Sequence, residues 1–229
     1  MPKQEREGNR GSAGGAPPSA EDRIDETLVE SFPASDPPPW TTTHAGPPTE
    51  PSAESIADVL TFWFVDPARW WEKDPAFDAE IRARFLTLHG AIARGDREDW
   101  RETARGALAY VVVLDQFSRN MFRGSSRSFE YDALALAAAR AALDRGFDRV
   151  LSDDERSFLC MPFMHSEAMA DQDRCVLLFA SGPPRNLSYA ERHRDIIRRF
   201  GRFPHRNALL GRASTAEEEK FLEEPGSSF

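Results

Sequence analysis

The feature that most constrains the fold is an apolar stripe at helical spacing, bounded by signals that begin and end a helix. Asp74 is a capping residue, and Pro75 suits the first helical position. Gly95 is suited to end the helix. Between them, apolar side chains recur at intervals of three or four residues: Phe77, Ile81, Phe85, Leu88 and Ile92. This pattern predicts an amphipathic helix whose stripe packs into a core.

Comparable patterns recur through residues 53–229 and predict an all-α domain. The β-branched run near Val111 is also compatible with a strand, but no nearby segment has a matching pattern. We therefore interpret it as a buried helix. Short loops are expected between the remaining helices, which cover residues 54–64, 103–117, 129–145, 188–200 and a last segment that ends before Pro225.

Two capping-box patterns predict further helix starts. Ser152 and Glu155 form the first, ahead of a helix that Pro162 is expected to interrupt before it resumes. Ser214 and Glu217 form the second, at the start of the last helix.

The first 52 residues differ in composition and predict a disordered tail. They contain ten of the 17 prolines and five of the 14 glycines, but only two aromatic residues, Phe32 and Trp40. A segment with so few apolar groups cannot offset the entropy lost on ordering. Within it, residues 23–40 end in SFPASDPPPW. We interpret them as a solvated linker or, alternatively, as a linear docking motif whose partner is unknown.

The charge distribution narrows the range of partners. The formal net charge is −9, and the tail, with four basic and nine acidic residues, carries −5 of it. Because the arginines are spread along an acidic chain, general nucleic-acid binding is disfavoured. No stretch approaches the roughly 20 apolar residues of a membrane span, and the first residues lack the apolar core of a signal peptide. We expect a cytoplasmic protein with no nucleic-acid or membrane partner.

The sequence lacks the motifs that identify common catalytic, phosphate-binding and metal-binding sites. It contains no H-E-x-x-H, no phosphate-binding glycine loop, no G-x-S-x-G and no paired-cysteine metal pattern. Cys160 and Cys175 are the only cysteines, which fits a reducing cytosol, and both are expected to be small buried side chains. We predict neither a metal nor a cofactor.

Three segments place polar groups where the periodicity predicts burial. The first has an acid and an arginine four residues apart, the spacing of a helical ion pair. Its members are Asp115, Gln116, Arg119, Asn120 and Arg123. Members of the second are His165, Glu167, Asp171 and Gln172. The third surrounds two phenylalanines and contains His193, Asp195, Arg202, His205, Arg206 and Asn207.

The third segment carries the best argument for a ligand. Gly201 is expected to end one helix and Pro204 to begin the next. The side chains of residues 205–207 would then lie near free backbone N–H groups. Since a helix N-terminus beside arginines attracts anions, this turn predicts a phosphate or carboxylate site.

Five stretches of the domain resemble an uncharacterised bacterial family, the domain of unknown function numbered 924. They are VLTFWF (59–64), WWEKDPAFDAEI (70–81), LDQFSRNMFRG (114–124), MPFMHSEAMADQDR (161–174) and HRDIIRRFGRFPHRNALLGRASTAEEEKFL (193–222). The resemblance implies an all-helical, tetratricopeptide-like fold. It implies no known activity.

Three functions are compatible with these residues. The leading hypothesis is a binding protein that recognises an anionic small molecule or an acidic peptide in a polar groove. The second is an enzyme that uses His165 or His193 as acid–base group, oriented by Glu167 or Asp195, beside an arginine-lined anion pocket. The third is a helical interaction module in which polar residues only hold corners together. The predicted ligand-binding residues are Arg119, Asn120, Arg123, Gln172, Arg202, His205, Arg206 and Asn207.

Overall fold

The computed structural model describes residues 54–181 and 184–227, and all regular secondary structure in these ranges is helical. The all-α prediction is therefore confirmed, whereas the tetratricopeptide-like arrangement stays a prediction. The tail of residues 1–52 and its 23–40 segment lie outside the described residues. Among the described helices, none combines the length and the apolar character needed to cross a bilayer.

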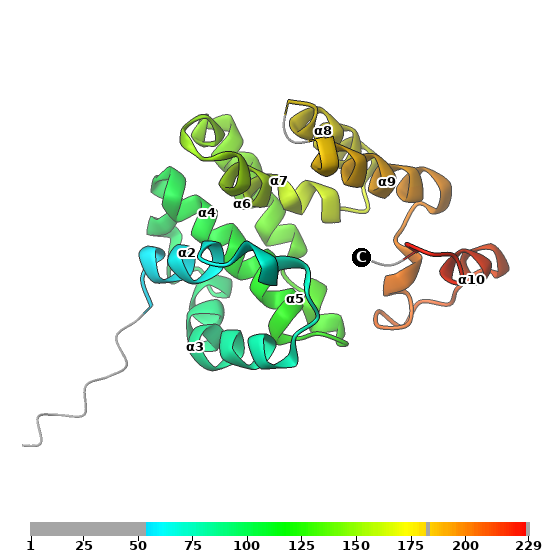
Figure 1. The fold of residues 1–229 in the computed structure, drawn as a ribbon, viewed down its shortest axis with the longest axis horizontal. Helices are drawn as coiled ribbons and strands as arrows, with labels where there is room; N and C mark the ends of the chain where they lie inside the picture. The colour runs from blue at the N-terminus through cyan, green and yellow to red at the C-terminus, as the bar shows by residue number, and fades with distance from the viewer. Residues whose placement is uncertain (1–53, 182–183, 228–229) are drawn as a thin grey trace, which may run out of the picture. The chain divides into compact units, whose positions relative to one another are not determined.

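The chain folds into α-helices joined by short 3₁₀ turns (Figure 1). The α-helices are α2 (Ile56–Phe64), α3 (Pro75–Ala93), α4 (Ala104–Val112), α5 (Ser118–Met121), α6 (Asp132–Asp144), α7 (Asp153–His165), α8 (Met169–Phe179), α9 (Pro184–Phe200) and α10 (Ala216–Leu222). A π-helical turn, Val113–Phe117, joins α4 to α5. The 3₁₀ turns are Pro67–Trp71, Glu98–Glu102, Ser126–Phe129, Phe147–Val150 and Pro204–Arg206.

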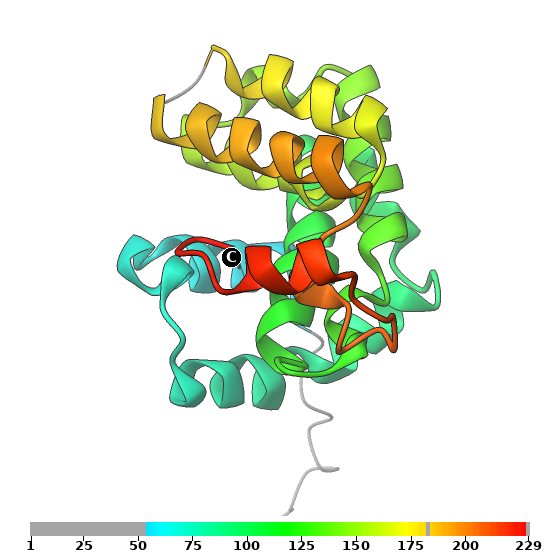
Figure 2. The same cartoon turned by 90° about the vertical axis from the view of Figure 1, so that its right-hand side faces the viewer.

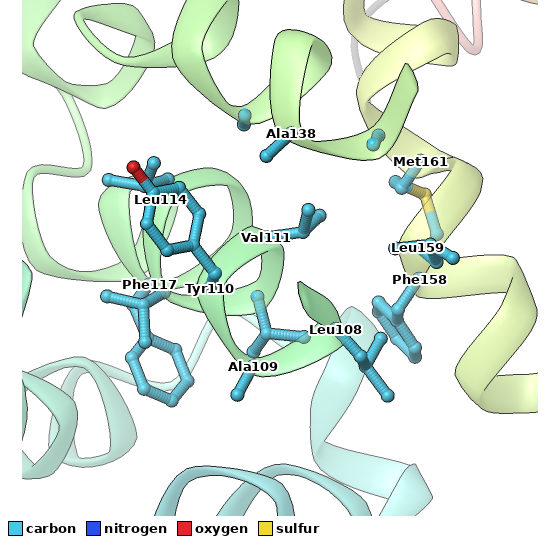
Figure 3. Packing of buried hydrophobic residues seen from close by; sticks show 14 of the residues in the cluster. Leu108, Ala109, Tyr110, Val111, Leu114, Phe117, Ala138, Phe158, Leu159 and Met161 are labelled. Atoms are coloured by element: carbon cyan, nitrogen blue, oxygen red, sulfur yellow. The ribbon is translucent and has the colours of Figure 1, made fainter. Parts of the chain in front are cut away.

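Helix α4 forms the centre of the core. Residues 108–114 are 0% exposed, so the helix is covered on all sides. It packs against α2, α6 and α7. Figure 3 shows Val111 of α4 on the side of Ala138 of α6, and Leu108 of α4 beside Phe158 of α7. Full burial explains why this β-branched segment reads equally well as a strand, since a helix buried all round loses its amphipathic period.

The predicted stripe of α3 is confirmed, because all five of its members are buried. Phe85, for example, is 0% exposed, and its ring centroid lies 4.8 Å from that of Phe117. The helix begins as predicted, with the Asp74 carboxylate accepting from Ala76 N at 2.8 Å. Gly95 follows its end with φ +86°, a conformation that favours glycine.

Pro162 does not interrupt its helix, so that prediction is wrong. It lies inside α7, which continues to His165. A proline removes one backbone N–H, and the buried side chains on either side of Pro162 hold the helix through this defect. The break comes instead after His165, where Gln172 Nε2 donates to the carbonyls of Met164 and Ser166 at 2.8 and 2.6 Å. These bonds satisfy carbonyls at the end of α7.

Two other predicted helix starts are also wrong. Helix α9 begins at Pro184 rather than at Ser188, since a proline fits the first helical position. The last capping box uses Thr215 and Glu218 rather than Ser214 and Glu217. Ser214 is engaged elsewhere, because its hydroxyl accepts from Asn207 Nδ2 at 3.1 Å.

The C-terminal part of the domain packs around a small second core. Helices α8 and α9 run side by side, and α10 follows after the loop that leaves α9 (Figures 1 and 2). Buried Ile196, Ile197 and Phe203 form this core. Phe203 N donates to Glu167 at 2.8 Å, so the turn of residues 201–207 lies beside the segment that follows α7.

Candidate functional site

A chain of polar contacts links five elements of the fold, and we call it the polar cluster: Asp115, Arg119, Asp132, His165 and Arg206. His165 Nδ1 lies 2.7 Å from Asp115 Oδ1. Arg119 lies 3.1 Å from Asp115 and 3.0 Å from Asp132. Arg206 Nη1 donates to Asp132 Oδ2 at 3.1 Å. The cluster thus joins residues from all three polar segments of the sequence.

The π-helical turn carries Asp115, a member of the polar cluster, and places it in the core. Its side chain is 0% exposed, and Gln116 Nε2 donates to it at 2.6 Å. The extra residue of a π-turn shifts the register of the helix, and such turns are frequent at functional sites. Ser118 closes the turn, because its hydroxyl donates to Leu114 O at 2.6 Å. Asp115 and Arg119 then pair with each other, and each contacts a further helix, α7 through His165 and α6 through Asp132.

Asp115 and His165 form a fixed pair. Burial raises the pKa of the Asp115 carboxyl, but the charge of Arg119 and the hydrogen bonds from His165 and Gln116 outweigh it and hold the pKa well below its ordinary value. Burial, assisted by Arg119, lowers the pKa of His165. His165 is therefore neutral at pH 7, and its Nδ1 donates to an ionised carboxylate. Its second ring nitrogen, Nε2, makes no hydrogen bond within the described part of the chain.

Arg206 lies between two aromatic rings. Its guanidinium carbon is 4.6 Å from the ring centre of Phe129 and 4.7 Å from that of Phe203. The side chain is 8% exposed. Only Nη1 makes a hydrogen bond, so that Nε and Nη2 have no acceptor among residues 54–181 and 184–227. Burial, followed by repulsion from Arg119, lowers the pKa of Arg206 to about 10.

The turn that presents Arg206 is held by an ion pair. Phe203 N donates to Glu167 Oε1 at 2.8 Å, and Arg212 donates to both oxygens of Glu167 at 2.7 and 3.0 Å. Arg212 also donates to Phe203 O at 3.2 Å. Both backbone groups of Phe203 are therefore fixed, which positions Arg206 three residues later.

The predicted anion site at a helix N-terminus is not formed in the way that the sequence suggested. Pro204–Arg206 is a single 3₁₀ turn rather than the start of a helix. The N–H groups of Arg206 and Asn207 are already bonded to the carbonyls of Phe203 and Pro204. The geometry therefore leaves the guanidinium, not these backbone groups, to meet a ligand.

Two further histidines adjoin the cluster. The rings of His193 and His205 each lie 5.6 Å from that of Phe203. Burial lowers the pKa of His193 to about 3 and that of His205 to about 4, and Arg206 contributes to both shifts. Both rings are therefore neutral at pH 7.

The predicted orienting acids do not contact either candidate base. Glu167 pairs with Arg212, and Asp195 pairs with Arg198 at 2.6 Å. His193 Nδ1 instead lies 2.8 Å from the carbonyl of Tyr189. The acid that orients His165 is Asp115, 50 residues away in the sequence.

Five predicted ligand residues serve other contacts. Asn120 and Arg123 donate to Asp78 of α3 at 2.8 and 2.6 Å. Arg202 makes two hydrogen bonds to Glu218, at 2.6 and 2.7 Å, and so ties α10 to the end of α9. Gln172 caps α7, as described above. Asn207 donates to Ser214, while its Oδ1 has no partner in the described ranges.

Sequence reasoning missed Asp132 and Phe129. Asp132 joins the two arginines, yet in the sequence it only opens an alanine-rich helix. Phe129 lies in the preceding 3₁₀ turn and stacks on Arg206. An acid in the first turn of a helix is common, so no local pattern distinguishes Asp132 from an acid that only interacts with the helix dipole.

The cysteines and the metal-binding residue types offer no second site. Cys160 and Cys175 are free and buried, as predicted, and burial raises the pKa of Cys160 to about 12. In the ranges that the structure describes, no group of three His, Cys, Asp or Glu residues is arranged to hold a metal ion.

Comparison with known proteins agrees with the family resemblance. Residues 59–226 match the family described as "Bacterial protein of unknown function (DUF924)", a range that includes the whole polar cluster. The solved structure of a protein of unknown function from Agrobacterium tumefaciens is similar, with 44% sequence identity and a TM-score of 0.72. That similarity covers 73% of this chain and 96% of the other. No curated protein matches the sequence.

Proposed function

Because the chain belongs to the DUF924 family, whose description states no activity, function has to be inferred from the site, and we propose that the polar cluster binds a small anionic molecule. The observation that carries this proposal is Arg206. It is a buried cation whose Nε and Nη2 groups lack acceptors in the described residues. A buried donor without a partner costs free energy that a ligand oxygen would recover.

The electrostatics of the cluster support an anion in particular. The pKa of Arg206 is lowered by burial and then by Arg119, while Asp132 only partly compensates. The pKa values of the neighbouring histidines are lowered as well, with arginine charges among the causes. Burial and the neighbouring positive charges therefore both disfavour the charged forms of Arg206 and of these histidines, and a carboxylate or phosphate placed against Arg206 would relieve this repulsion.

Limited access favours a small molecule over an acidic peptide. The Arg206 side chain is 8% exposed, and those of His165 and Arg119 are 14% and 20% exposed. These low exposed fractions favour a small molecule over a peptide.

Thermal melts of the full chain at matched ionic strength test the proposal. Phosphate or a small carboxylate should stabilise the native protein, by about 2.7 kcal/mol at a ligand concentration 100 times the Kd. Arg206→Ala should lose this protection. Arg123→Ala is the matched control, because Arg123 also pairs with an aspartate but lies outside the cluster. If no anion protects the unmodified protein beyond the effect of ionic strength, the proposal is wrong.

A second candidate, acid–base catalysis, is favoured by the Asp115–His165 pair. A neutral imidazole held by a buried carboxylate is the usual arrangement of a general base. His193 Nδ1 faces the carbonyl of Tyr189, whereas His165 Nδ1 faces a carboxylate, so the geometry favours His165 of the two predicted bases. For any substrate that is turned over, His165→Asn should lower kcat by about 10²-fold or more. An unchanged kcat would remove this candidate.

A further inference from the structure

We infer that the ligand of the polar cluster is an anion that carries its own hydroxyl, such as a protonated phosphate or a hydroxycarboxylate. This inference rests on the proposed function and names the chemical class of the ligand. It follows from the position of the hydrogen on His165 and from the kinds of hydrogen-bonding groups that surround the cluster.

Two donors around Asp115 fix the hydrogen of His165 on Nδ1. Gln116 Nε2 donates to Asp115 at 2.6 Å, and the Arg119 guanidinium lies 3.1 Å away. A carboxylate with two such donors is ionised and can only accept from His165. The Nδ1 atom, at 2.7 Å, must therefore be the donor. In a neutral ring the other nitrogen, Nε2, then carries a lone pair.

The unused groups of the cluster are consequently of two kinds. Arg206 offers N–H donors at Nε and Nη2, and an arginine has no acceptor. His165 offers an acceptor at Nε2, which has no partner in the described part of the chain. A shared network of Asp115, Arg119 and Asp132 connects the two residues. The ligand that we infer spans both residues, so that it meets donors on one side and an acceptor on the other.

This mixture discriminates between anions of similar size and charge. Sulfate and acetate are pure acceptors at neutral pH, so they satisfy Arg206 but bring an oxygen lone pair against His165 Nε2. Phosphate and glycolate also satisfy Arg206, and each has an O–H to donate to that nitrogen. Sites built to pair with a ligand hydroxyl reject analogues that lack it, because the site's own polar group is left unpaired.

Two matched pairs of anions provide the test. Thermal melts and calorimetric titrations of the full chain at pH 7 and constant ionic strength would compare phosphate with sulfate and glycolate with acetate. The hydroxyl-bearing member should bind at least about tenfold more tightly in one pair or both. A preference in the first pair identifies a phosphate-type ligand, and one in the second a hydroxycarboxylate. Charge cannot explain a preference for phosphate, since sulfate carries no less charge at this pH.

The variant His165→Asn removes the hydrogen-bond acceptor at Nε2 and keeps the hydrogen bond to Asp115. An asparagine amide can still donate to Asp115 in place of Nδ1, but it provides nothing at the position of Nε2. The variant should keep its affinity for sulfate and acetate and lose the preference for the hydroxyl-bearing anion.

Each result decides between the two proposals. Equal binding of both members in each pair would overturn the inference and leave the proposed anion site intact, as would a preference that survives in His165→Asn. Failure of all four anions to bind would remove the proposed site and this inference with it.

Discussion

His193 gives a test of the electrostatics that does not depend on any ligand. It is 5% exposed, and burial lowers its pKa to about 3, whereas an unfolded histidine titrates near 6.5. Above pH 6.5 the ring is neutral in both states, so it adds no pH dependence. Below that pH the unfolded chain binds a proton that the folded chain does not. The free energy of unfolding therefore falls as the pH decreases from 6.5 towards about 3.

The size of this effect follows from the pH interval. One pH unit corresponds to 1.36 kcal/mol, so at pH 5, which is about 1.5 units below the unfolded pKa, His193 should cost about 2 kcal/mol of stability. The variant His193→Gln cannot titrate. Its destabilisation relative to the unmodified protein should therefore be about 2 kcal/mol smaller at pH 5 than at pH 7.

Urea unfolding, followed by tryptophan fluorescence at the two pH values, measures this difference. His89 and His205 also titrate, but they are present in both chains and cancel in the comparison. If the difference in stability between the two chains is the same at pH 5 and pH 7, then His193 is not buried as a neutral ring, and the electrostatic reasoning for the cluster fails with it.

Two further predictions concern the core and the tail. Phe85→Ala should destabilise the domain by about 3–5 kcal/mol, because Phe85 is 0% exposed and its ring packs against Phe117; a loss below about 1 kcal/mol in urea unfolding would contradict its place in the core. Limited proteolysis should trim the chain to about residue 50 and leave a folded domain, as expected for a proline- and glycine-rich segment. Protection of residues 1–45 would show that the tail prediction is wrong.

Local sequence signals predicted a helix boundary correctly when one or two neighbouring residues determine it. The start of α3 at Pro75 depends only on the Asp74 cap and on the proline that follows it. The prediction that Pro162 interrupts its helix failed because a local rule was used. That rule considers the lost N–H and not the buried neighbours that hold α7 together. Ser214 failed as a cap because its hydroxyl is used by Asn207, seven residues earlier.

Four of the five residues of the polar cluster could be predicted from the sequence, but their contacts could not. Sequence proximity favoured Glu167 as the partner of His165, yet the partner is Asp115, on another helix. Glu167 and Asp115 both offer a carboxylate, so no local sequence pattern shows which of the two lies near His165 in space. The convergence of Arg119, His165 and Arg206 became visible only through Asp132, which sequence reasoning did not select.

The contact between Arg206 and Asp132 also determines when the cluster can be completed during synthesis. The two residues are 74 positions apart, and Arg206 is the later one. While the ribosome is still adding the residues between them, Arg119 alone faces the two carboxylates of Asp115 and Asp132, which leaves one negative charge uncompensated. A nascent chain therefore cannot bury this region at low cost until its C-terminal quarter has emerged. A chain that stalls before residue 206 would expose this unpaired acid, which gives a quality-control system a chemical difference between an incomplete chain and a finished one.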